Sequence, residues 1–129
     1  NIEEQPLWLK ELFRVTKPGG YLFLTVEGLH ALKHWLHLDL SLGLKDASDK
    51  LDKEGYIFSP YKNWNETIQQ SNILRNASQL VGVKSPYGIM VMSEKYVYHN
   101  WNKYNLEIVD IIKGIITTRQ DLVVLRKKN

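Results

Sequence analysis

The feature that most constrains the fold is a glycine corner that leads directly into an apolar strand. The segment TKPGGYLFLT places Pro18, Gly19 and Gly20 immediately before the run of residues 21–26. Proline disfavours helix at the residue before it, and the two glycines allow a tight reversal of the chain. An apolar run without polar alternation is typical of a strand covered on both faces in a parallel sheet. The corner therefore predicts an α/β protein.

An amphipathic helix precedes the corner. Residues 6–15 begin with Pro6, which suits the first helical position, and Leu9, Leu12 and Phe13 share one face. The order of helix, short glycine turn and buried strand is that of the second half of a βαβ unit.

The middle of the chain gives a weaker pattern. It predicts short helices over residues 29–38 and 45–54, and short strands over 56–59 and 87–92, with a polar stretch between the strands. We interpret this middle part, from residue 29 to residue 92, as an insertion or cap.

The last part of the chain predicts a helix and a hairpin. Ser93 is a good N-cap for a helix that continues to about residue 103. A β-branched strand over 106–112, a turn region over 114–119 and an apolar strand over 122–125 follow. The link is too short for a parallel crossover, so the two strands must be antiparallel.

Composition excludes several classes of protein. The 129 residues fit one domain, and the chain contains no cysteine, which excludes disulfides and thiolate metal sites and fits a reducing compartment. The net charge of +3 forms no basic stripe, and no apolar run approaches the roughly 20 residues of a membrane helix. We therefore expect a cytoplasmic protein with neither nucleic acid nor membrane as a partner.

Segments at both ends of the chain resemble a known family. RVTKPGG before the first strand, SEKYVYHNW, and the closing strands LEIVDIIKG and RQDLVVLRK are similar to parts of class I S-adenosylmethionine-dependent methyltransferases. The resemblance implies that residues 1–28 are the late helix and fifth strand of that fold, and that 93–129 are its last helix and closing hairpin. It implies a partial Rossmann-like sheet whose last strand lies antiparallel between the fifth and sixth.

The resemblance implies S-adenosylmethionine as cofactor, but no G-x-G occurs in the chain. Close approach of a backbone to such a cofactor needs glycines, and its ribose needs a carboxylate. We therefore expect the cofactor-binding half to precede Asn1, and the isolated chain to bind the cofactor poorly and to be inactive. The alternative is a non-enzymatic α/β module for binding or assembly.

The candidate site lies at the carboxyl ends of the parallel strands, where open α/β sheets bind ligands. Methyl transfer requires alignment of a small-molecule acceptor and, for oxygen or nitrogen, removal of a proton. Glu27 and His30 are the candidate catalytic bases, with a solvated carboxylate as the alternative for Glu27. His30, His34 and His37 have a helical spacing that suggests a metal site, but no carboxylate completes the set. Surface histidines are therefore favoured, and no metal is predicted.

Six further residues are predicted to contact the substrate: Thr25, Gly28, Trp64, Tyr87, Gln120 and Asp121. The alternatives are packing of a small subdomain for the two aromatic residues, and fixation of the hairpin for Asp121. Without a neighbour on its other side, the strand over residues 21–26 would expose a long apolar edge. Such edges invite pairing, so we also predict self-association of the isolated chain.

Overall fold

The computed structural model describes residues 2–35, 44–60 and 88–129, which contain both helices and strands. In chain order they are α1 (Gln5–Val15), β1 (Tyr21–Glu27), α2 (Leu29–Trp35), α3 (Leu44–Glu54), β2 (Tyr56–Pro60), β3 (Gly88–Met92), α6 (Glu94–Trp101), β4 (Leu106–Ile116) and β5 (Gln120–Lys127). The predicted α/β class is confirmed. No helix in the described ranges is long and apolar enough to cross a membrane.

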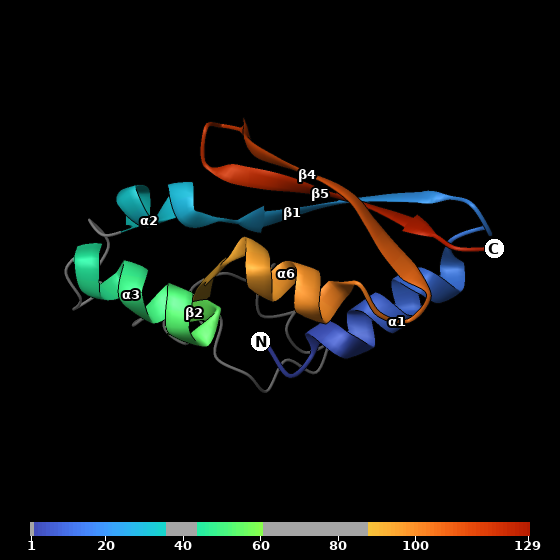
Figure 1. Ribbon diagram of the computed structural model, residues 1–129, viewed down its shortest axis with the longest axis horizontal. Helices are drawn as coiled ribbons and strands as arrows, with labels where there is room; N and C mark the ends of the chain where they lie inside the picture. The colour runs from blue at the N-terminus through green and yellow to red at the C-terminus, as the bar shows by residue number, and fades with distance from the viewer. Residues whose placement is uncertain (1, 36–43, 61–87) are drawn as a thin grey trace, which may run out of the picture.

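The five strands form one mixed sheet in the order β2-β3-β1-β5-β4 (Figure 1). β1 pairs in parallel with β3 through Glu27 and Val91, and it pairs antiparallel with β5 along its whole length. β5 also pairs antiparallel with β4. The closing strand therefore lies between β1 and β4 and runs opposite to both.

The glycine corner is a turn at the amino end of β1. Gly19 has a φ of 71°, a conformation that glycine adopts without the strain a side chain would add. Its N–H donates to the carbonyl of Lys127, and the Lys127 N–H donates to the carbonyl of Gly20. The Lys127 ammonium donates to the carbonyls of Phe13 and Thr16 at the end of α1. The corner thus joins α1, β1 and β5 at the edge opposite the candidate site.

The hairpin differs from the prediction. β4 continues past residue 112, and residues 114–116 belong to the strand rather than to a turn. A register shift between Ile112 and Ile116 accommodates Gly114, whose φ is 59°. The turn itself contains Thr117 and Thr118, with φ values of 53° and 56°. The glycine that indicated a turn therefore forms a bulge.

Helices α1 and α6 cover one face of β1, β5 and β4 (Figure 1). The buried residues of this core are Leu9, Val26, Met92, Val97, Trp101, Leu106, Val123 and Leu125. A second cluster joins α2 and α3 to β2 and β3 through Ala31, Leu32, Ala47, Leu51, Ile57 and Val91. The strands of the middle segment therefore continue the same sheet.

The opposite face of β1 is open. Tyr21 and Phe23 point to this face and are 52% and 65% exposed, whereas Val26 on the covered face is 4% exposed. The prediction that this strand is covered on both faces is wrong for this chain. Along the strand's outer edge, the described pairing with β3 is limited to Glu27 and Val91. Self-association stays a prediction.

Candidate functional site at the end of β1

Four of the predicted site residues lie together where β1 ends and β5 begins. The register pairs Glu27 with Gln120 and Val26 with Asp121, so Gly28 follows beside the start of β5. β3 reaches the same edge, because Val91 pairs with Glu27. The strand ends thus meet as the sequence predicted. Alternation along β1 divides the four residues between the two faces of the sheet.

On the open face, Glu27 is fixed by two side chains of the closing hairpin. Its Oε1 accepts a hydrogen bond from Gln120 Nε2 at 2.9 Å and lies 3.4 Å from Arg119 Nε. The side chain of Glu27 is 13% exposed and that of Arg119 is 35% exposed, so the pair lies at the rim of the sheet. Bonds of this kind hold a carboxylate in one orientation.

Arg119 is the site residue that the sequence analysis missed. It directly precedes Gln120, so it enters β5 beside the end of β1. Its position next to two predicted site residues was the available signal. Arg119 contacts Glu27 because its long side chain reaches across from the turn. Strand register alone does not predict this contact.

On the covered face, Asp121 makes a buried contact within the hairpin. It is 7% exposed, and its Oδ1 accepts a hydrogen bond from the Gly114 N–H at 2.8 Å. A Cβ added to Gly28 would lie 2.7 Å from Asp121 Cγ, so only glycine leaves room for this carboxylate. These contacts fit the alternative in which Asp121 holds the hairpin. A substrate contact of Gly28 or Asp121 stays a prediction.

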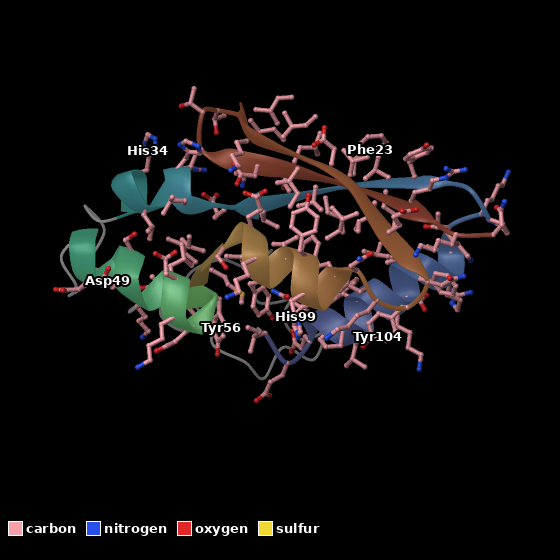
Figure 2. All side chains as sticks on the ribbon, viewed as in Figure 1. Phe23, His34, Asp49, Tyr56, His99 and Tyr104 are labelled. Atoms are coloured by element: carbon pink, nitrogen blue, oxygen red, sulfur yellow. The ribbon has the colours of Figure 1, made fainter. Side chains whose placement is uncertain are left out.

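Two further predicted residues near the end of β1 are exposed. Thr25 is exposed on the open face of β1, and His30 is exposed in the first turn of α2. His34 projects from the side of α2 away from α3 (Figure 2). No group of histidines and carboxylates within the described ranges can hold a metal ion. Three residues fall outside the described residues: His37, Trp64 and Tyr87.

Five of the described glycines lie against other parts of the chain. A Cβ added at any of five described glycines would lie within 4 Å of the chain's own atoms: Gly19, Gly20, Gly28, Gly55 and Gly114. A cofactor loop instead uses glycine to let the ligand approach the backbone. These five glycines therefore do not form such a loop.

Comparisons with known proteins add no relative to this picture. No protein-family model, no curated protein and no solved structure matches the chain. The fold and the site define an α/β protein with a reversed closing strand and a fixed carboxylate at the end of β1.

Proposed function

We propose that the chain is the C-terminal portion of an S-adenosylmethionine-dependent methyltransferase that acts on a small-molecule acceptor. One observation carries the proposal. The closing strand lies antiparallel between β1 and β4, which run in the same direction, and this is the arrangement that the resemblance implies. The position of Glu27 at the carboxyl end of β1 adds support, because ligands bind there in open α/β sheets.

Glu27 is the proposed general base, and Arg119 and Gln120 are its positioning residues. A base must present its carboxylate within hydrogen-bond reach of the acceptor's proton. Gln120 and Arg119 hold Glu27 Oε1 in place. Because the Glu27 side chain is only 13% exposed, an acceptor can reach it only from the rim of the sheet. His30 is the second candidate for the base. The methyl group would come from S-adenosylmethionine, which we expect to be bound by residues upstream of Asn1.

Calorimetry with S-adenosylmethionine tests the proposal. The natural protein, including any region encoded upstream of Asn1, is expected to bind the cofactor, and the isolated chain is expected to show no binding heat. Failure of the natural protein to bind refutes the methyltransferase assignment. Sequencing the upstream coding region gives an independent test, because a strand followed by a glycine-rich loop is required there.

A matched pair of variants tests the role of Glu27. Glu27→Gln is expected to lower transfer of tritiated methyl groups into the small molecules of a cell extract by about 10²- to 10⁴-fold, with unchanged cofactor affinity. Glu107→Gln is the control, since Glu107 lies on β4 in the sheet row of Arg126, at the opposite end of the strands. Equal effects of the two variants would exclude Glu27 as the base.

The open face of β1 favours a second candidate function, a non-enzymatic module for binding or assembly. Phe23 is 65% exposed on a strand whose other face is buried. Monomeric proteins rarely expose large contiguous apolar surfaces unless these bind a partner. Absence of a glycine-rich loop from the natural protein would favour this candidate.

A further inference from the structure

An apolar patch crosses the open face of β1, β5 and β4 diagonally. Strand register places Phe23 beside Val124 and Leu122 beside Ile112, so the apolar side chains shift along the strands from β1 to β4. We call this the diagonal patch, and its residues are Tyr21, Phe23, Val124, Leu122, Ile112 and Ile116. Tyr21, Phe23, Ile112 and Ile116 each keep 38% or more of their surface exposed.

The dimensions of the diagonal patch match one α-helix. Strands lie about 4.8 Å apart and rise about 3.3 Å per residue, so the patch is about 20 Å long and about 10 Å wide. A helix with side chains is about 10 Å wide, and about 14 residues span 20 Å. A second sheet, including that of a second copy, packs through a broad apolar face. Polar side chains flank the diagonal instead, with Asp110 on one side and Thr25 on the other.

The charged residues beside Val124 and Tyr21 carry one excess negative charge, because Asp110 and Glu107 are acidic and Arg126 is basic. Asp110 is exposed and lies in register with Val124. Its Oδ1 accepts a hydrogen bond from the Ile111 N–H at 2.8 Å, and no ion pair between described residues includes it. The neighbouring Arg126 lies in register with Glu107, and its Cζ lies 5.8 Å from the centroid of the Tyr21 ring. A partner that covers the patch therefore gains from a cation placed at Asp110.

We propose that the diagonal patch docks an amphipathic α-helix of about 14 residues that carries a narrow apolar stripe and a lysine or arginine beside Asp110. The width of the patch selects a helix, its length sets the number of turns, and the charge of Asp110 sets the orientation of the helix. This inference does not rest on the proposed methyl transfer, and it holds for either candidate function.

Two fluorescein-labelled helical peptides of 14 residues test the proposal. Both carry the same leucine stripe, with lysines flanking it in one and glutamates in the other. Fluorescence anisotropy with the full chain is expected to show about fivefold tighter binding of the lysine peptide. Asp110→Lys is expected to reverse this preference, a result that loss of folding cannot produce.

Variants of exposed aromatic residues locate the binding surface. Phe23→Asp is expected to weaken binding of both peptides at least about tenfold, as for a central interface residue. Tyr98→Asp is the control, because Tyr98 is 44% exposed on α6. The proposal is overturned by equal affinities for the two peptides, by no binding, or by binding that Phe23→Asp leaves unchanged. A dimer that Phe23→Asp dissociates in light scattering also overturns it, since a second copy would then occupy the patch.

Discussion

Replacing Gly28 with alanine tests what holds the carboxyl end of β1 together. The added Cβ would lie 2.7 Å from Asp121 Cγ, closer than the contacts that real Cβ atoms make, so the carboxylate has to move. Asp121 is 7% exposed, and its Oδ1 accepts the Gly114 hydrogen bond at 2.8 Å. We expect this movement of the whole carboxylate to weaken or break the bond that its Oδ1 accepts.

The expected cost follows from that bond. A hydrogen bond to a charged group contributes about 1.5–3 kcal/mol, and a buried group left without its partner adds about 1–3 kcal/mol. Because the strand end can shift and relieve part of the clash, we expect Gly28→Ala to lower the free energy of unfolding by about 3 kcal/mol. This is a large part of the roughly 5–15 kcal/mol that stabilises a typical domain. Urea unfolding followed by circular dichroism measures it.

A double-mutant cycle isolates the contact between these two residues. Asp121→Ala vacates the space, so Gly28→Ala is expected to cost less than about 1 kcal/mol in that background. The same cost in both backgrounds would refute the reasoning. A small cost in the wild type combined with lost acceptor binding would instead favour the predicted substrate contact of Gly28.

Three further predictions concern the hairpin turn, the start of α1 and α6. Replacing Thr117 and Thr118, whose φ values are 53° and 56°, with the Asn-Gly pair that type I′ turns favour is expected to raise the free energy of unfolding by about 1–2 kcal/mol in urea. Gln5→Leu removes the acceptor of the Trp101 Nε1–H at 3.2 Å and is expected to cost about 1–2 kcal/mol, whereas Gln5→Glu, which keeps an acceptor, costs less. Burial raises the pKa of Tyr96, so the unfolded state loses the phenolic proton first and stability falls as the pH rises above about 10. Tyr96→Phe is expected to reduce this fall in thermal melts between about pH 9 and 11, and an unchanged pH dependence would refute it.

The elements that the sequence predicted well depend on local patterns. The bounds of α1 follow from Pro6 and the apolar face, and Ser93 caps α6 by accepting a hydrogen bond from the Tyr96 N–H. The end of β4 was predicted wrongly because Gly114 has the same positive φ in a bulge as in a turn. Only the pairing with β5 distinguishes the two, and pairing depends on residues distant in the sequence.

The covering of β1 shows a second limit. Apolar side chains on both faces of a strand are typical of burial in a parallel sheet, but they do not require it. α1 and α6 cover the face of Val26, and no described helix covers the face of Phe23. The apolar run therefore predicted the strand correctly, but it did not predict that one face of the strand is exposed.

Successive side chains of β1 and β5 point to opposite faces of the sheet, so the candidate site has one part on the covered face and one part on the open face. Asp121 opposes Val26 on the covered face and ties the hairpin to the end of β1, whereas Glu27 opposes Gln120 on the open face. An acceptor that reaches Glu27 must therefore approach from the open face, where Ile116 of the diagonal patch lies in register with Gln120. A helix docked on the patch would then form one wall of the acceptor site. If both proposals hold, Phe23→Asp would weaken docking of the helix and so lower methyl transfer by the natural protein. Phe23 itself is not one of the predicted bases.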